Sequence, residues 1–421
     1  MVLKYRITAV ATGLLLVTSL TALCQAENWA QFRGPGGRAQ SSATGLPTTW
    51  DAQSNIVWKT ELPGPGASSP TTYGDRIYVT CCTGVESADS SDASAMQRHL
   101  ICFNRADGQV VWNAAQPSTN PQQAYGGFRQ LHGYASGTPT IDDDGIYVFY
   151  GTTGAAAYSH DGDQLWLTNC GTGTHGFGTG SSPTLYENLV IVNACVESGS
   201  LIALDKKTGQ EVWRQSGIDM SWCTPSLVKT SDGNWEVVVS MKGQILGFDP
   251  ATGEKLWWCA GIPDYICPSV LVQDDVLFAT GGRKNKVIAI RAGGRGDITG
   301  TNKLWELGNG ANVPSPVYHA GHLYWANDRG IAYCADAKTG ELLYEERLSS
   351  DKFYASPVAV DGKLYYVTRE KGAFVVPAEP RFEILAENVI ETDDSVFNGS
   401  PVISNGQILL RSDKFLYCIG Q

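Results

Sequence analysis

A unit of four short strands, repeated along most of the chain, most limits what this sequence can fold into. The clearest copy is residues 182–213, where apolar and polar residues alternate in runs of about five. Turn signals fall at residues 187–188, 195–199 and 205–209. In the last turn Asp205 caps the turn and Gly209 takes the positive-φ position, four residues before Trp213. This pattern predicts an antiparallel four-stranded sheet.

The unit recurs with a proline near the start of its first strand. Six of the seven spacings between these prolines lie between 41 and 48 residues, and the first is 69. The prolines are Pro70, Pro139, Pro183, Pro225, Pro268, Pro316, Pro357 and Pro401. Four strands at this period are typical of propeller blades. The sequence therefore predicts an all-β fold, an eight-bladed β-propeller of four-stranded antiparallel blades.

The last unit, residues 400–419, ends after three strands. The missing strand is available near the start of the chain, in residues 55–62, where Trp58 precedes the first proline by 12 residues. We expect this N-terminal strand to pair with the C-terminal blade, which closes the ring and leaves no free sheet edge. The predicted organisation is a signal peptide at 1–26, a lead-in segment at 27–54 and the propeller at 55–421.

The first 26 residues have the pattern of an export signal. Lys4 and Arg6 precede an apolar run at 9–23, and Cys24-Gln25-Ala26 forms a small-x-small cleavage site. The run is too short for a membrane span, so we expect a cleaved, periplasmic or secreted protein. We expect no lipid anchor at Cys24, because Leu23 stands where a lipoprotein signal needs a small residue.

Charge and cysteine content narrow the function classes. Without Lys4 and Arg6 the chain has 29 basic and 42 acidic residues, a net charge of −13. An acidic exported protein is a poor nucleic-acid binder, so we expect no nucleic-acid partner. Ten cysteines remain besides Cys24, and some disulfides are expected in an oxidising compartment, with their connectivity left open.

The turn motif resembles that of the pyrroloquinoline-quinone (PQQ)-type propeller family, Ala-x-Asp-x-x-Thr-Gly-x-x-x-Trp. The structural motif residues that carry the resemblance are Asp205, Gly209, Trp213, Asp249, Gly253 and Trp257. The resemblance implies the propeller fold over nearly all of the mature chain. The family includes both quinone-dependent dehydrogenases and a cofactor-free scaffold of the outer-membrane barrel-assembly machinery. The lead-in Trp29-x-x-Phe32-Arg33-Gly34-Pro35 also looks like that of a large set of exported members.

Strand order places the inter-blade loops and the loops between second and third strands on one face. From the inter-blade loops we expect ligand- or partner-binding residues near the axis: Arg129, His132, His175, Trp222, Tyr265 and Tyr354. A basic rim is expected further out, from Arg283, Lys284, Lys286, Arg329, Arg369 and Arg411. Such a rim would attract a protein partner or an anionic small molecule. The alternative is that these cations only decorate exposed turns.

These residues leave two functions open. The preferred interpretation is an exported, non-catalytic, monomeric binding or scaffolding propeller with no cofactor and no metal. The alternative is a PQQ-dependent dehydrogenase, since aromatic rings and guanidinium groups suit a flat anionic quinone. The resemblance would add Ca²⁺ and a vicinal disulfide, for which Cys81 and Cys82 are candidates at a different position from that of the dehydrogenases. His132 and His175 could share a metal or proton role or be structural, and sugar binding by the funnel aromatics is a third possibility.

Overall fold

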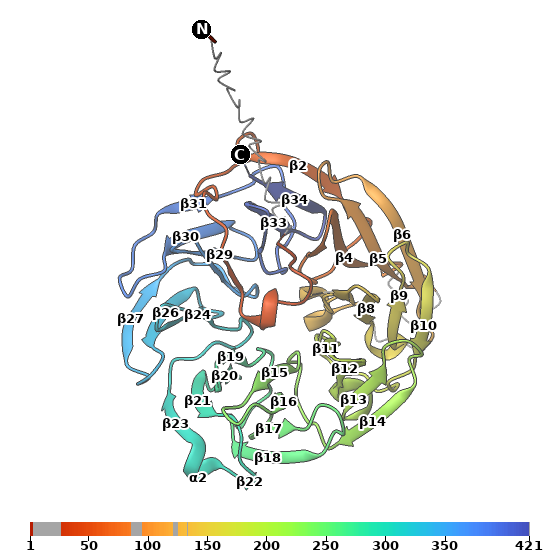
Figure 1. The fold of residues 1–421 in the computed structure, drawn as a ribbon, viewed down its shortest axis with the longest axis vertical. Helices are drawn as coiled ribbons and strands as arrows, with labels where there is room; N and C mark the ends of the chain where they lie inside the picture. Colours follow the sequence, from red (N-terminus) through yellow and green to blue (C-terminus); the bar gives the residue numbers. More distant parts are fainter. Residues whose placement is uncertain (3–26, 86–94, 121–124, 133, 421) are drawn as a thin grey trace.

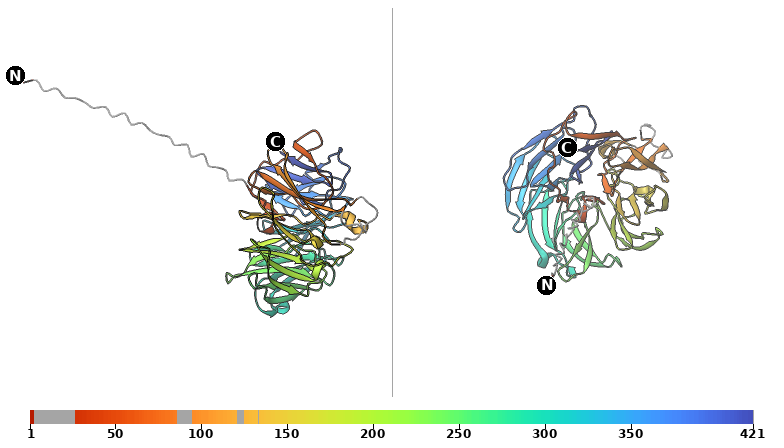
Figure 2. Two further views of the ribbon diagram at one scale, coloured as in Figure 1. Left: turned by 90° about the vertical axis from the view of Figure 1, so that its right-hand side faces the viewer. Right: turned by 45° about the horizontal axis from the view of Figure 1, so that its top comes forward.

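The eight predicted blades stand in a ring around a central axis (Figure 1). The computed structural model describes residues 1–2, 27–85, 95–120, 125–132 and 134–420, so the predicted signal peptide and Cys24 lie outside the described residues. Each sheet in the described part of the chain has four antiparallel strands, and two of the sheets gain a parallel fifth strand. The protein is an eight-bladed β-propeller, which confirms the predicted fold class. The edge-on and tilted views show the blades as one closed disc (Figure 2).

Blades 1 to 4 follow one another along the chain, each running from its inner to its outer strand. Blade 1 contains β3 (Thr71–Tyr73), β4 (Arg76–Thr83), β5 (Gln97–Asn104) and β6 (Val110–Pro117). Blade 2 contains β7 (Thr140–Asp142), β8 (Gly145–Phe149), β9 (Ala155–Tyr158) and β10 (Gln164–Thr168). Blade 3 contains β11 (Thr184–Tyr186), β12 (Leu189–Ala194), β13 (Ser200–Asp205) and β14 (Glu211–Ser216). Blade 4 contains β15 (Ser226–Lys229), β16 (Trp235–Met241), β17 (Gln244–Phe248) and β18 (Lys255–Ala260).

Blades 5 to 8 complete the ring. Blade 5 contains β19 (Leu271–Gln273), β20 (Val276–Gly281), β21 (Lys286–Arg291) and β23 (Lys303–Leu307). Blade 6 contains β24 (Val317–His319), β25 (His322–Ala326), β26 (Ile331–Asp336) and β27 (Leu342–Arg347). Blade 7 contains β28 (Val358–Val360), β29 (Lys363–Val367), β30 (Ala373–Pro377) and β31 (Ala386–Asn388). Blade 8 contains β32 (Val402–Ser404), β33 (Gln407–Arg411), β34 (Phe415–Ile419) and β2 (Ile56–Glu61).

The short elements lie in loops or at the axis. They are β1 (Gln40–Ser41), β22 (Gly296–Asp297), α1 (Cys195–Ser198), α2 (Thr299–Asn302), η1 (Pro35–Gly37), η3 (Gly127–Leu131) and η4 (Gly151–Thr153). β1 pairs in parallel with the innermost strand of blade 7, and β22 pairs in parallel with the outermost strand of blade 4. These two strands are the fifth members of their sheets.

The ring closes by the predicted exchange of strands between the chain ends. β2 pairs antiparallel with β34, with Trp58 opposite Cys418 and Glu61 opposite Phe415. The two strands lie side by side at the top of Figure 1. Blade 8 therefore takes its outer strand from residues 56–61 and its inner three strands from the C-terminus, so unfolding either end opens the ring.

A closed circle of hydrogen bonds runs around the inner strands. In each blade a backbone N–H donates to a Ser or Thr hydroxyl in the next blade, over 2.9–3.1 Å, and Ser400 returns to Ser69. The members in ring order are Ser69, Thr138, Ser182, Thr224, Ser269, Ser315, Ser356 and Ser400. We call these eight residues the hydroxyl ring. It fixes the spacing of neighbouring blades at the axis.

The hydroxyl ring shows that the predicted repeat proline of blade 5 was assigned to the wrong position. Seven of its members stand directly before the blade's proline, but in blade 5 Pro268 stands before Ser269. Val270 takes the place that proline holds elsewhere: its carbonyl accepts from Ser226 Oγ, as the Pro225 carbonyl accepts from Thr184 Oγ1. Counting Pro268 as the repeat proline was therefore wrong by two residues, although the number of blades was unaffected.

A second repeated contact locks the outer strands. The indole of Trp213 packs on Gly253 in the next blade's turn and donates from Nε1 to the Pro250 carbonyl over 3.1 Å. A Cβ at Gly253 would lie 2.6 Å from the Trp213 ring, so the turn needs glycine both for its φ of 73° and for this close packing. Trp58, Trp112, Trp166 and Trp305 make the same contact with the blade that follows each of them.

Trp257 departs from this pattern. Its Nε1 donates to Glu236 Oε2 over 2.7 Å, and its ring packs on Gly247 within its own blade. The reason lies in blade 5, where the turn that would receive it is replaced by the longer segment containing β22 and α2. β22 instead pairs beside Trp257 and covers the edge of blade 4. Trp257 therefore keeps the sequence motif without making the contact between blades that Trp213 makes.

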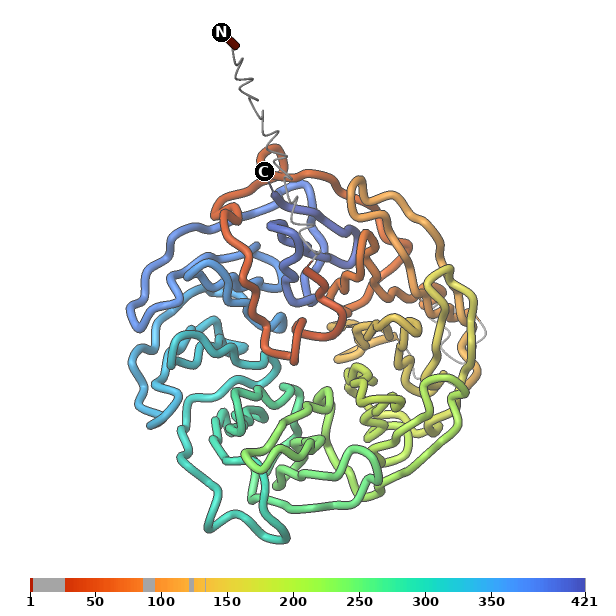
Figure 3. The backbone as a smooth tube through the Cα atoms, viewed as in Figure 1, coloured from red at the N-terminus to blue at the C-terminus, as the bar shows by residue number. Residues whose placement is uncertain are grey.

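The lead-in crosses the centre of the ring (Figure 3). Its start is held at blades 1 and 2, where the Trp29 carbonyl accepts from Thr72 N and the Ala30 carbonyl accepts from Ile141 N. Its end reaches blade 7 through β1. Trp29 is buried, and a Cβ at Gly34 would lie 2.6 Å from its ring. The segment thus obstructs the central channel with its own packed turn.

The cysteines in the described part of the chain are ten free thiols, so the expected disulfides are not formed there. Cys81 and Cys82 are neighbours on the regular strand β4, opposite His99 and Arg98 of β5. Successive side chains of a strand point to opposite faces of the sheet. The candidate vicinal disulfide is therefore absent, and both thiols are buried structural groups.

We predict that Trp213→Ala lowers the free energy of unfolding by about 3–5 kcal/mol, because it removes a buried indole and its inter-blade hydrogen bond. Denaturant unfolding of a chain that begins at residue 27 measures this. The matched control is Trp235→Ala on β16, whose side chain is 44% exposed, with a loss within about 1 kcal/mol. Equal losses in the two variants would contradict the inter-blade role of Trp213.

Candidate functional site

The inter-blade loops converge on a cavity of about 200 Å³ at one end of the central channel. Its walls combine aromatic side chains with members of the hydroxyl ring, and Phe32 of the lead-in borders it as well. The predicted residues His132, Trp222, Tyr265 and Tyr354 all line it. We call this the axial cavity and its side of the ring the inter-blade face.

Phe177 is the hub of an aromatic cluster beside the axial cavity. Its ring centroid lies 5.0 Å from those of Phe128 and His175, 5.3 Å from that of Trp222 and 5.2 Å from that of Tyr265. Edge-to-face and tilted pairs at this separation are favourable. Phe128 is 53% exposed, so the cluster runs from the cavity to solvent. Phe128 and Phe177 are not among the predicted binding residues, although Phe128 stands next to Arg129 and Phe177 stands two residues after His175.

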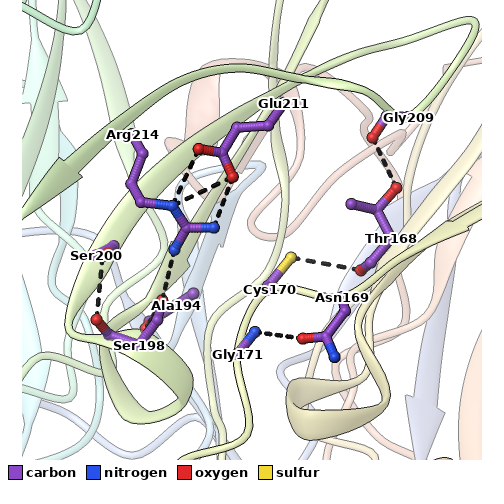
Figure 4. A network of polar contacts seen from close by, with 10 residues as sticks. All are labelled: Thr168, Asn169, Cys170, Gly171, Ala194, Ser198, Ser200, Gly209, Glu211 and Arg214. Carbon is purple, nitrogen blue, oxygen red and sulfur yellow. Dashed lines mark hydrogen bonds and ion pairs between the residues drawn. The ribbon is translucent and has the colours of Figure 1, made fainter.

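The loop that carries Phe177 begins at the end of blade 2, where hydrogen bonds hold residues 168–171 in place (Figure 4). We call these residues the corner. The Gly171 N–H donates to Asn169 Oδ1 over 2.7 Å, and Thr168 Oγ1 donates to the Gly209 carbonyl of blade 3 over 2.6 Å. In the neighbouring blade 3, Arg214 pairs with Glu211 and donates to Ser198 Oγ. The corner holds the beginning of the loop to the frame of blades 2 and 3.

His132 ties two inter-blade loops together. Its Nδ1 lies 2.5 Å from Ser136 Oγ, and its Nε2 bonds to the Phe177 carbonyl. Burial lowers the pKa of His132, which favours the neutral ring. His175 packs edge-on against Trp222 and accepts the Phe177 N–H on Nδ1. Both nitrogens of His132 are engaged within the protein, so the arrangement supports the structural interpretation of the pair.

Arg369 and Arg411, expected on the basic rim, are buried. Arg369 lies 4.6 Å above the Tyr354 ring and donates to Asn398 Oδ1 over 3.0 Å and to the Leu131 carbonyl over 3.4 Å. Arg411 is 1% exposed. It donates to Ser68 Oγ and to the Thr80 carbonyl over 3.2 and 2.8 Å, which joins blade 8 to blade 1. Their expected place on an exposed rim is therefore wrong.

The remaining cations do not form a uniformly basic rim. Arg283, Lys284 and Arg329 are exposed, whereas Lys286 pairs with Glu306. Arg283 lies 5.6 Å from the Tyr265 ring. Acidic residues stand among them: Asp264 Oδ2 accepts the Arg283 N–H, and Asp351 Oδ2 accepts the Glu370 N–H. The rim has mixed charge, and none of Arg283, Lys284 and Arg329 forms an ion pair with another described residue. Arg129 donates to the Gly176 carbonyl beside the cluster.

Glu197 is a buried acid next to this face. It lies in α1, is 4% exposed, and accepts the Thr179 hydroxyl on Oε1. Within the described residues its Oε2 has no hydrogen-bond partner. Burial raises the pKa of Glu197 to about 7 from an ordinary value near 4.5. The burial of Glu197 could not be predicted from the sequence, because the residue stands in a segment whose pattern is typical of an exposed turn.

The quinone and Ca²⁺ of the dehydrogenase resemblance do not fit this donor set. Arg369 and Arg411 use their donors on protein carbonyl, amide and hydroxyl groups. A Ca²⁺ site needs clustered carboxylate or carbonyl oxygens, and the described residues bring no three His, Cys, Asp or Glu side chains together as a metal site. Glu197 does not line the axial cavity. We therefore derive no chemical step through a quinone.

The geometry defines a propeller whose central channel ends in a small aromatic cavity. Its repeats match the family described as outer membrane protein assembly factor BamB, built of PQQ-type repeats, at residues 35–130, 197–295 and 294–379. The match covers more than half of the sequence, and the chain belongs to this family of PQQ-type propellers. Among the described residues, no helix is long and apolar enough to pass through a membrane.

Comparison with individual proteins extends this result. Outer membrane protein assembly factor BamB of Yersinia pestis is 20% identical over 352 residues, 77% of this chain and 78% of the relative. The crystal structure of BamB from Moraxella catarrhalis has a TM-score of 0.62 at 14% identity, covering 87% of this chain and 97% of that one. Quinohemoprotein alcohol dehydrogenase from Comamonas testosteroni has a TM-score of 0.64 at 11% identity, covering 94% and 81%. At these identities the structures share the fold alone.

The buried carboxyl makes stability depend on pH. The unfolded chain releases the Glu197 proton near pH 4.5, whereas the folded protein holds it to about pH 7. Unfolding therefore releases a proton across this window, and the free energy of unfolding falls as pH rises through it. We predict that Glu197→Gln removes this loss, so that its advantage over wild type grows by roughly 2–3 kcal/mol from pH 5 to pH 8. Urea unfolding at both pH values tests this, and an unchanged difference would count against it.

Proposed function

We propose that this protein is an exported, monomeric, non-catalytic binding propeller, and that a protein partner docks on the inter-blade face over the axial cavity. The aromatic cluster around Phe177 carries the proposal. A half-exposed phenylalanine at the mouth, in contact with further rings that lead down to the cavity, suits an apolar anchor from a partner. The name of the Yersinia pestis relative, an assembly factor, agrees with a binding role.

The size of the axial cavity favours a side chain over a cofactor. Its volume of about 200 Å³ is below the roughly 300–1,000 Å³ typical of pockets for drug-sized ligands. Leu131 lines the cavity, and its carbonyl accepts from both Arg369 and Asn398 in the loops of blades 7 and 8. A loop held in this way keeps this part of the cavity wall in place before binding, which reduces the entropy cost of ordering it when a partner docks.

In this proposal the exposed cations of the inter-blade face orient the partner as it approaches. Arg283, Lys284 and Arg329 lie on blades 5 and 6, on one side of the axial cavity. In an acidic protein they would direct an acidic stretch of the partner to that side. Rim charges of this kind change the association rate more than the final affinity.

Site-specific photocrosslinking tests the docking face. A photoreactive residue at position 128 is expected to capture a discrete partner in the native envelope, identified by mass spectrometry. The same residue at position 235, an exposed Trp on the opposite face, is the matched control and should not capture that partner. Capture of one partner at 235 but not at 128 would refute the proposed face.

Charge reversal tests the orienting role. We predict that Arg283→Glu combined with Lys284→Glu slows association with the captured partner about tenfold at low salt, and less at high salt. The control reverses two exposed lysines on outer turns, Lys207→Glu with Lys255→Glu, which gives the same net charge. Equal slowing by both double variants would show that only net charge matters.

The proposal also excludes a bound quinone. We predict that the purified mature protein, supplied with PQQ and Ca²⁺, shows no new absorbance band and no shift in its melting temperature, because no described set of carboxylates is arranged to hold the cation. Reduction of an artificial electron acceptor in this mixture would instead establish the dehydrogenase alternative.

A further inference from the structure

A second cavity lies on the opposite face of the ring, and the function proposed above does not use it. Its volume is about 580 Å³. One wall is the lead-in, from Gln31 to Arg38, and the others are the inner strands and first turns of blades 3, 4 and 5. Phe32, Thr224 and Ser269 border both cavities. The lead-in therefore separates the two, and we call the second one the lead-in cavity.

Arg33 of the lead-in cavity is a buried cation, and two of its side-chain nitrogens are unsatisfied hydrogen-bond donors in the described part of the chain. Its side chain is 2% exposed, and its Nη2 donates to the Pro316 carbonyl. Its Nε and Nη1 have no partner among the described residues, and no described carboxylate pairs with it. Burial lowers the pKa of the Arg33 guanidinium to about 9, so it stays protonated at neutral pH. A buried charge without a partner is costly, and an oxyanion would remove that cost.

The outer part of the lead-in cavity adds further cations and an exposed ring. Arg38 and Lys229 are exposed lining residues, and Lys229 Nζ lies 6.0 Å from the Trp235 ring. Two acids also line it: Asp274 is exposed, and Asp275 pairs with Arg291 over 2.8 Å. With Arg33, three cations face one unpaired acid. This balance favours a negatively charged ligand, in a protein that is acidic overall.

We propose that the lead-in cavity binds a small organic anion, whose carboxylate or phosphate group pairs with Arg33 and whose flat apolar part lies against Phe32 and Trp235. A guanidinium is suited to either oxyanion, since its planar N–H groups form paired hydrogen bonds. Lys229 and Arg38 draw the anion to the mouth. The Phe-Arg-Gly-Pro turn of the lead-in thereby gains a role: Phe32 and Arg33 belong to one wall of the site, and Gly34 lets the turn pack on Trp29.

Calorimetric titration of the mature chain tests this with three probes: phenyl phosphate, benzoate and neutral benzyl alcohol. We expect at least one of the two anions to bind and benzyl alcohol not to bind; which anion binds tells phosphate from carboxylate. Arg33→Gln is expected to weaken binding about tenfold, the equivalent of one charge-assisted hydrogen bond. Lys229→Gln and Trp235→Ala, both at the surface, should each weaken it severalfold and keep the test valid if Arg33→Gln does not fold.

Phe128→Ser on the inter-blade face is the matched control and should leave anion binding unchanged. It separates this inference from the proposed function, since it alters the docking face alone. Three results would overturn the inference: no binding of either anion at millimolar concentration, equal binding by wild type and the three lead-in cavity variants, or binding of benzyl alcohol as strong as that of the anions.

Discussion

The hydroxyl ring is the contact on which the rest of this structure depends. Each member donates its N–H to the next blade and accepts on its hydroxyl from the blade before, so eight bonds of 2.9–3.1 Å close on themselves. The proline that usually follows keeps the member in an extended conformation, which is the one the inner strand needs. Because every inter-blade loop ends at this ring, the ring sets where each loop reaches the axis.

The ring also explains how one channel can hold two separate cavities. Its bonds join the inner backbone of all eight blades and hold them at a fixed spacing around the axis. The lead-in crosses at this level, with Phe32 bordering both cavities and Arg33 bonded to the Pro316 carbonyl of blade 6. Apart from Phe32, Thr224 and Ser269, the two cavities are lined by different residues, so a substitution such as Phe128→Ser alters the lining of the axial cavity alone.

The parts of the fold predicted from sequence are those fixed by short-range patterns. The turn motif and the spacing of prolines gave the number of blades, and the missing strand of the last unit gave the closure through Trp58. Side chains that act over long sequence distances could not be predicted. Arg411 bonds to Thr80, 331 residues away, and nothing near Arg411 distinguishes it from an exposed rim cation. Trp257 keeps the motif, but the insertion in the following blade removes its partner. A sequence pattern can therefore place a residue's backbone on one face of the ring. It cannot predict which groups a long side chain such as that of Arg411 will contact.

The hydrogen bonds of the arginines bear on the choice between the two candidate functions more than the fold does. The fold is shared both with BamB from Moraxella catarrhalis and with quinohemoprotein alcohol dehydrogenase from Comamonas testosteroni. A quinone site must leave guanidinium donors free to meet carboxylates of the cofactor. Here the guanidinium groups of Arg369 and Arg411 donate to carbonyl, amide and hydroxyl oxygens of the protein, and these bonds join loops and neighbouring blades. These bonds hold the loops and blades around the aromatic cavity in place. Under the proposed function, a partner would then meet a surface that is already formed, which lowers the cost of ordering on binding.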